Sequence, residues 1–174
     1  MGRQLIMVRP GLTDIPEAPA SPAVVRQANE SDADQLAALL TDAFDDPWTR
    51  QILDDRLLAA DDVDAIFVAE IDGQIVATAS SRQGPEDLPD HGCLHWVASS
   101  PAMRGQQLGA IVSIRVLRHF AESGFPSAML RTDDGRIPAV RTYLKLGFIP
   151  YYPDDDHLAR WSALFPRLLA PRAS

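Results

Sequence analysis

Hydrophobic and polar positions along the chain first predict a group of antiparallel strands. Residues 65–81 contain two β-rich runs joined by Asp72-Gly73, a dipeptide that supplies the positive φ values of a two-residue hairpin. A third β-rich run covers residues 93–100 and ends before a proline. The same pattern predicts shorter strands at residues 23–28, 127–132 and 148–152.

Helical periodicity marks the segments between these strands. Apolar side chains in residues 108–120 recur every three or four positions, and Gly124 ends the run. A later helix begins at Pro138 and ends at Gly147, because proline suits a first helical turn and glycine suits a C-terminal cap. Further helices are predicted at residues 32–44, 47–60 and around 158–165.

The order of these elements predicts the fold class. It reads β-α-α-β-β-β-α-β-α-β, so we expect an α/β (α+β) protein with a mixed, mostly antiparallel sheet of six to seven strands flanked by helices. Residues 1–23 form a proline-rich lead-in, in which residues 4–8 could add an edge strand. Residues 24–174 then form a single domain that ends in a helix, since 174 residues with 46% apolar composition suit one core.

Composition narrows the classes of function. The only cysteine, Cys93, excludes an internal disulfide and a cysteine zinc cluster, and the four histidines form no ligand-spaced pair, so we expect no metal. No apolar run approaches the ~18 residues that a membrane span needs, and the first residues lack a signal-peptide pattern. We therefore expect a cytoplasmic protein without a membrane segment.

Charge is distributed unevenly along the chain. The formal net charge of -8 argues against a nucleic-acid-binding protein, because phosphate backbones are held by Lys and Arg. Residues 1–98 hold 6 basic and 18 acidic side chains, whereas residues 99–150 hold 7 basic and 3 acidic ones. This asymmetry suits an anionic ligand in the later half and a cationic one opposite. The alternative, that the acidic helices only keep the protein soluble, stays open.

The turn at Ser99–Ala110 is the first candidate for binding chemistry. It joins a predicted strand to a predicted helix, so its backbone N–H groups lie at the positive end of that helix and can bind an anion. Gly105 and Gly109 allow close approach of a ligand, and Arg104 adds a permanent charge. The residues favour a diphosphate, although an ordinary loop would have the same composition.

Two segments together carry a resemblance to a known family. The turn Arg104–Ala110 is similar to the pattern Arg/Gln-x-x-Gly-x-Gly/Ala, and Ala139, Tyr143, Gly147 and Phe148 keep the spacing of a later helix motif. In this order and at this separation, they resemble the GNAT family of N-acetyltransferases over about residues 24–152.

The sequence departs from the family pattern at two positions. Gln107 stands in place of the motif's first glycine, which bears on how closely a diphosphate can approach that residue, although with a negative φ it could still offer its N–H. Arg136 stands where the family often has asparagine, so that side-chain contact cannot be carried over.

The resemblance implies acetyl-CoA as co-substrate and a direct transfer to an amine. Backbone amides in the turn would hold the CoA diphosphate, the backbone of the preceding strand would hold the pantetheine arm, and an amide at a bulge in that strand would polarise the thioester carbonyl. The expected cofactor-binding residues are Val97, Ser99, Arg104, Gly105, Gln106, Gln107, Leu108, Gly109 and Ala110.

Candidates for proton transfer follow from the resemblance and from the residues. Tyr143 matches the family tyrosine that protonates the departing thiolate, with packing in a helix core as the alternative. His95 is a candidate base because strand alternation places it on the same face as Val97 and Ser99, and Glu70 is a second candidate. A water chain could serve instead. Cys93 is interpreted as a buried cysteine rather than as a nucleophile.

The acceptor is expected to be a small-molecule or peptide amine. The acidic segments at residues 42–48 and 53–64 wall the acceptor site in the family and would favour a cationic acceptor, and family habit suggests a homodimer. Two other functions stay open: a non-catalytic acyl-CoA-binding regulatory module, and a phosphate-binding domain unrelated to CoA.

Overall fold

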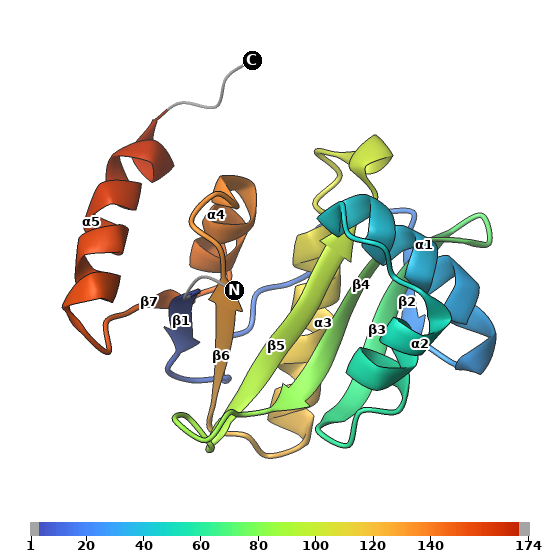
Figure 1. Ribbon diagram of the computed structural model, residues 1–174, viewed down its shortest axis with the longest axis horizontal. Helices are drawn as coiled ribbons and strands as arrows, with labels where there is room; N and C mark the ends of the chain where they lie inside the picture. The colour runs from blue at the N-terminus through green and yellow to red at the C-terminus, as the bar shows by residue number, and fades with distance from the viewer. Residues whose placement is uncertain (1–3, 171–174) are drawn as a thin grey trace.

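A seven-stranded sheet organises the protein, whose computed structural model describes residues 4–170. The strand order is β2-β3-β4-β5-β6-β1-β7 (Figure 1), and every neighbouring pair is antiparallel except β5 and β6. The mixed, mostly antiparallel sheet predicted from the sequence is therefore confirmed. The strands are β1 (Leu5–Arg9), β2 (Val24–Gln27), β3 (Val63–Ile71), β4 (Gln74–Gln83), β5 (His91–Ser99), β6 (Ser127–Thr132) and β7 (Ile149–Tyr151).

Helices cover both faces of this sheet (Figure 1). The helices on one face share a buried cluster with β3, β4 and the end of β5, and those on the other share a larger cluster with the opposite face of β3, β4 and β5 and with β1 and β6. The first group is η1 (Glu30–Asp32), α1 (Ala33–Phe44), α2 (Arg50–Leu53) and the π-helical η2 (Asp54–Leu58). The second group is α3 (Leu108–Glu122), α4 (Ile137–Lys145) and α5 (Asp155–Leu169), and the short η3 (Pro101–Met103) precedes α3.

Strand β1 lies inside the sheet rather than at an edge. It pairs with β6 on one side and with β7 on the other, and Leu5 and Met7 are fully buried. A short run that is apolar at successive positions suits a strand covered on both faces, which explains why the edge position expected for residues 4–8 is wrong. The side chain of Arg9 then holds the lead-in, because its Nε donates to the Leu146 carbonyl at 2.8 Å.

The parallel pair β5–β6 is short. Its paired residues run from His91 opposite Ser127 to Leu94 opposite Leu130, and beyond that point β5 continues to Ser99 without β6 beside it. The two strands separate there (Figure 1). The sheet is therefore open between them at the end that leads toward η3 and α3.

A β-bulge lies in β5 at the same place. His95 is opposite Ser80 and Ala98 is opposite Thr78, so two residues of β5, Trp96 and Val97, face a single residue of β4. Trp96 has a φ of 45°, in the left-handed region. Bulges of this kind redirect side chains and are frequent beside functional sites.

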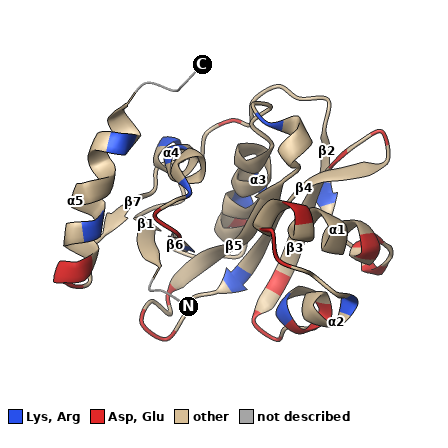
Figure 2. Ribbon diagram, turned by 45° about the horizontal axis from the view of Figure 1, so that its top comes forward, with Lys and Arg blue, Asp and Glu red and all other residues tan. Residues whose placement is uncertain are grey.

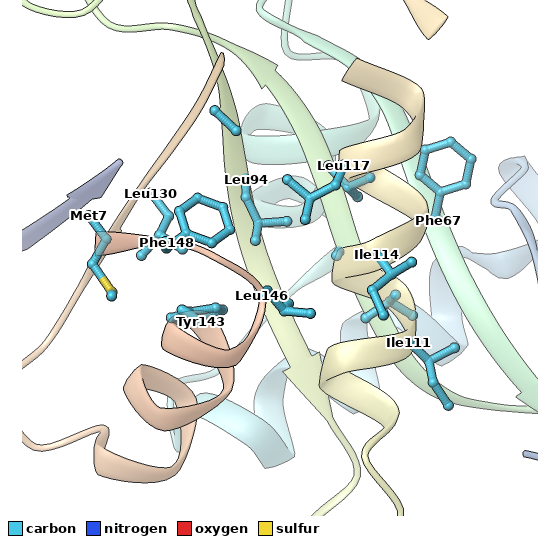
Figure 3. Packing of buried hydrophobic residues seen from close by; sticks show 14 of the residues in the cluster. Met7, Phe67, Leu94, Ile111, Ile114, Leu117, Leu130, Tyr143, Leu146 and Phe148 are labelled. Atoms are coloured by element: carbon cyan, nitrogen blue, oxygen red, sulfur yellow. The ribbon is translucent and has the colours of Figure 1, made fainter. Parts of the chain in front are cut away.

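The larger cluster requires α3 to approach β5 closely. Figure 3 shows Leu94 of β5 beside Leu117 of α3, and both belong to this cluster. A Cβ atom added to Gly92 of β5 would lie 2.4 Å from a ring carbon of Phe120, a fully buried side chain of α3. Only glycine therefore fits at position 92.

We predict that Gly92→Ala destabilises the protein by about 1–3 kcal/mol, the usual cost of overpacking a core. Urea unfolding of the variant and the parent measures the difference. Gly11→Ala is the matched control, because a Cβ at that position meets no atom within 4 Å. Equal midpoints for Gly92→Ala and the parent would contradict the close packing of α3 on β5.

Candidate active site

A cavity of about 600 Å³ lies where β5 and β6 separate, a size typical of small-molecule sites. Its walls come from β5, from the end of β4, from the connection between β6 and α4, and from the end of α1. His95, Trp96 and Val97 of the bulge line it on one side, and Tyr143 of α4 lines it on another. The opening in the sheet thus becomes a pocket that reaches the bulged strand.

The turn before α3 presents backbone N–H groups next to this cavity. Gln107 precedes the helix and makes no side-chain cap, whereas at the start of α5 the side chain of Asp154 accepts from the amide of His157. The first amides of an α-helix have no acceptor within the helix, so those of Leu108, Gly109 and Ala110 are open to an anion. The turn is a neighbour of the cavity, because a Cβ at Gly109 would lie 3.9 Å from the Val97 side chain, which lines it.

The backbone of the turn keeps the conformation that glycine would favour. Gln107 has a φ of 57° and Gly105 a φ of 87°, both in the left-handed region. The negative φ considered for Gln107 is therefore wrong, since the turn geometry overrides the residue type. The space beside Gly105 is open, because an added Cβ would meet no atom within 4 Å.

The bulge changes the face on which His95 lies. Leu94 and Val97 pack in the cluster beneath α3, whereas Trp96 and Ala98 pack in the cluster beneath α1 and α2. His95 lies next to Trp96, with ring centroids 4.9 Å apart. The expectation that His95 shares a face with Val97 is wrong, because the extra residue of the bulge breaks the alternation.

Tyr143 is a buried phenol in the wall of the cavity. It is 6% exposed and packs with Leu146 and Phe148 (Figure 3). Burial raises the pKa of Tyr143 to about 12, against a smaller opposing effect of the charge on Arg136. The hydroxyl therefore keeps its proton at neutral pH, as a proton donor to a leaving group must.

His95 is a neutral imidazole at the same wall. Burial, and secondly the charge on Arg82, lower the pKa of His95 to about 4. Its Nε2 lies 3.5 Å from Nη1 of Arg82, which pairs with Asp62. Because a guanidinium can only donate, this contact favours the tautomer with the proton on Nδ1. Such a ring is a weak base.

Two other candidates from the sequence take different places. Glu70 does not line the cavity: its carboxylate accepts from Arg26 at 2.7 Å, on the side of β3 that pairs with β2. The second candidate base is therefore wrong. Cys93 is buried in the cavity wall, so the interpretation as a buried cysteine is confirmed, and burial raises the pKa of its thiol to about 11.

The cavity is less acidic than the charge of the N-terminal half suggests. Acidic positions gather on α1, α2 and the segments beside them (Figure 2), but among the acidic segments only Phe44 and Asp62 reach the cavity. Of the arginines that the structure describes, three also line it, namely Arg82, Arg131 and Arg136. Sequence reasoning missed the first two, because no local motif connects them to residues 95–97; only the pairing of β4 and β6 with β5 brings them together.

The length and the apolar character of the helices determine whether one of them could span a membrane. Within residues 4–170, none of them combines the length and the apolar character that spanning a bilayer requires.

Solved structures share this fold at low sequence identity. A GNAT-family acetyltransferase from Novosphingobium aromaticivorans is 20% identical, with a TM-score of 0.64 over 87% of this chain and 61% of its own. The ribosomal-protein-S18-alanine N-acetyltransferase of Escherichia coli is 19% identical, with a TM-score of 0.61 over 77% of this chain and 86% of its own. These likenesses establish the fold.

Curated relatives and a family profile give the sequence relationship. A mycothiol acetyltransferase of Thermomonospora curvata is 30% identical over 87% of this chain and 54% of its own length, and one of Parafrankia sp. is 33% identical over 89% and 56%. The chain thus spans about half the length of these relatives. The profile of the acetyltransferase (GNAT) family matches residues 33–148. The protein therefore belongs to the GNAT acetyltransferase family.

Proposed function

We propose that the protein is an acetyl-CoA-dependent N-acetyltransferase that transfers an acetyl group directly to a primary amine of a small molecule or peptide. Family membership supports acetyl transfer, and the relatives named mycothiol acetyltransferase share that chemistry. Their acceptor is not carried over, because only about half of their length is matched. The observation that carries the proposal is the protonated phenol of Tyr143 in a cavity that adjoins an uncapped helix start.

The turn before α3 would hold the diphosphate of CoA. Amides of residues 105–110 would donate to its oxygens, that of Gln106 in exchange for its 3.4 Å bond to the Met103 carbonyl, while Arg104 adds a positive charge and the helix dipole favours the anion. The backbone of Val97 and Ser99, on the open edge of β5, would hold the pantetheine arm. When bound, acetyl-CoA supplies an activated acyl group as a thioester. A solved GNAT-family neighbour, YhbS of Escherichia coli, was determined in complex with CoA.

The residues around the bulge then act on the reaction. The bulge at Trp96 and Val97 leaves one residue out of the ladder with β4, so an amide there is free to donate to the acyl oxygen as negative charge develops on it. The phenol of Tyr143 donates its proton to the departing sulfur. No covalent bond to the protein is needed, which agrees with the un-ionised thiol of Cys93.

Removal of the amine proton is assigned to water rather than to His95. A group whose pKa is about 4 holds a proton too weakly to take one efficiently from an ammonium group. The acceptor therefore reacts in its neutral form, and the neutral imidazole of His95 orders water or the amine beside the bulge. The role expected of His95 is thereby reduced to positioning.

We predict that Tyr143→Phe lowers kcat by roughly 10²–10⁴-fold, the usual contribution of a general acid, and leaves KM for acetyl-CoA nearly unchanged. Release of free thiol from acetyl-CoA across a panel of primary amines measures both. Tyr152→Phe, at an exposed tyrosine, is the control. A non-catalytic acyl-CoA-binding module would bind CoA and release no thiol from the parent or either variant.

The pH dependence of protein stability tests whether the imidazole of His95 is neutral in the folded protein. The pKa of His95 is about 4 in the folded protein against about 6.5 in the unfolded chain, so below pH 6.5 the unfolded state binds the extra proton. Stability should thus fall as pH drops from about 6.5 to about 4, and His95→Gln should remove part of that fall. Thermal unfolding at pH 7 and pH 5 measures it. The same loss of Tm in parent and variant would contradict a buried neutral imidazole.

Gln107→Gly tests the turn. A non-glycine residue in the left-handed region costs about 1–2 kcal/mol, and the extra freedom of glycine in the unfolded chain offsets about half of this. We expect Tm to rise slightly and CoA to bind at least as tightly, measured by differential scanning calorimetry and isothermal titration calorimetry. Gly105→Gln, the reverse change at a second left-handed position, should lower Tm. Weaker CoA binding by Gln107→Gly would show that the Gln107 side chain itself holds the coenzyme.

A further inference from the structure

Arg136 differs from the other cations of the cavity in having no anionic partner. Arg82 pairs with Asp62, and Nη2 of Arg131 lies 2.9 and 3.0 Å from the two carboxylate oxygens of Asp87. Within residues 4–170, the guanidinium of Arg136 forms no hydrogen bond or ion pair, although the residue lines the cavity. A half-buried guanidinium without acceptors is costly unless a ligand supplies them.

Packing holds this guanidinium against another residue of the cavity wall, Phe44. Its Cζ lies 4.5 Å from the centre of the Phe44 ring, a geometry in which a cation is attracted to the face of the ring. Phe44 ends α1 on one side of the sheet, and Arg136 precedes α4, so the contact joins the two walls. The ring face offers no lone-pair acceptor, so this contact leaves the N–H groups of the guanidinium available for hydrogen bonds.

Arg136 also lies near the reacting end of the cavity. It precedes Tyr143 by seven residues, about two turns of α4, and its charge acts on the Tyr143 phenol. A group held by Arg136 is therefore on the side of the cavity where the acetyl group is transferred. The turn before α3, where the diphosphate is assigned, belongs to a different element of the site.

We propose that Arg136 binds the carboxylate of the acceptor, so that the acceptor is an amine that also carries a carboxylate, as an amino acid does. This inference rests on the proposed acetyl transfer and names the substrate class of the same site. A carboxylate matches the planar fork of a guanidinium with two parallel hydrogen bonds. The rest of the acceptor lies against the aromatic walls formed by Phe44 and Trp96.

Charge balance favours a carboxylate over a phosphate group. One unpaired cation balances the single charge of a carboxylate, whereas a phosphate ester carries about -1.5 to -2 at neutral pH. The additional negative charge would meet Asp133, which also lines the cavity and whose carboxylate, within residues 4–170, accepts only from the neutral amide of Gln4, at 3.2 Å. The unpaired charge of Arg136 also disfavours the purely cationic acceptor expected from the acidic helices, because the guanidinium repels a second cation.

Matched acceptors test the proposal. Acetyl transfer is measured with L-leucine, L-methionine and L-phenylalanine and with their carboxamides. The α-amino group of a carboxamide is less basic than that of the free amino acid, so kcat/KM is calculated for the concentration of neutral amine. Binding of N-acetyl-L-phenylalanine and of N-acetyl-L-phenylalaninamide to the CoA-loaded protein gives a second measurement that is independent of amine ionisation. We expect the carboxylates to be preferred roughly tenfold to hundredfold, the usual worth of a hydrogen-bonded charge pair.

Variants at position 136 assign the preference to this side chain. Arg136→Gln should bring the ratio between carboxylate and carboxamide to about one, with KM for acetyl-CoA unchanged, and Arg136→Lys should retain part of the preference because it keeps the charge but loses the fork. Arg118→Gln, which removes an equal charge from a pair with Glu17 outside the cavity, should keep the parent ratio. Calorimetric CoA binding and Tm show that each variant is folded.

Other outcomes overturn the inference in distinguishable ways. Equal turnover of carboxylates and carboxamides by the parent would show that the acceptor carboxylate is not recognised. A higher KM for acetyl-CoA in Arg136→Gln, with the acceptor ratio unchanged, would assign Arg136 to the coenzyme. An equal fall of kcat for both acceptor types would assign it to the chemistry of Tyr143. If none of the six amines is acetylated and no primary amine causes release of thiol from acetyl-CoA, both the acetyltransferase proposal and this inference are overturned.

Discussion

The separation of β5 from β6 after Leu94 is the constraint on which the site depends. Parallel strands normally continue side by side, and their exposed N–H and C=O groups need partners when they part. Here the parting opens the cavity, leaves the last residues of β5 with an edge that is free on one side, and leads that edge into the turn before α3. The strand and turn proposed to bind the coenzyme lie on one side of this gap, and Tyr143, the proposed proton donor, lies on the other.

Burial sets the protonation state of three groups around that gap. The same loss of water raises the pKa of Tyr143 and of Cys93 and lowers the pKa of His95, because in each case it disfavours the charged form. All three groups are consequently neutral at physiological pH. This arrangement suits a transfer in which the protein holds one proton ready, polarises an acyl oxygen with fixed backbone groups and forms no ion of its own.

The arginines show how charge in the cavity differs from charge along the chain. Two of the three are paired with carboxylates from loops, which leaves Arg136, among the described residues of the cavity, as the cation without an anionic partner. The residue stands at the one position of the later motif where the sequence departs from its family. A departure from a family motif and an unpaired charge in a cavity thus coincide at one side chain.

The sequence by itself determined the element order, the mixed sheet, the turn before α3 and the helix that carries Tyr143, since hairpin dipeptides, helical periodicity and glycine positions act over a few neighbouring residues. It could not place β1 inside the sheet, because strand partners are chosen by contacts far apart in the chain. Nor could it show which face His95 takes or which arginines are paired. Only the tertiary structure decided these, because one extra residue in a strand reverses its faces and an ion pair forms wherever folding brings two distant side chains together.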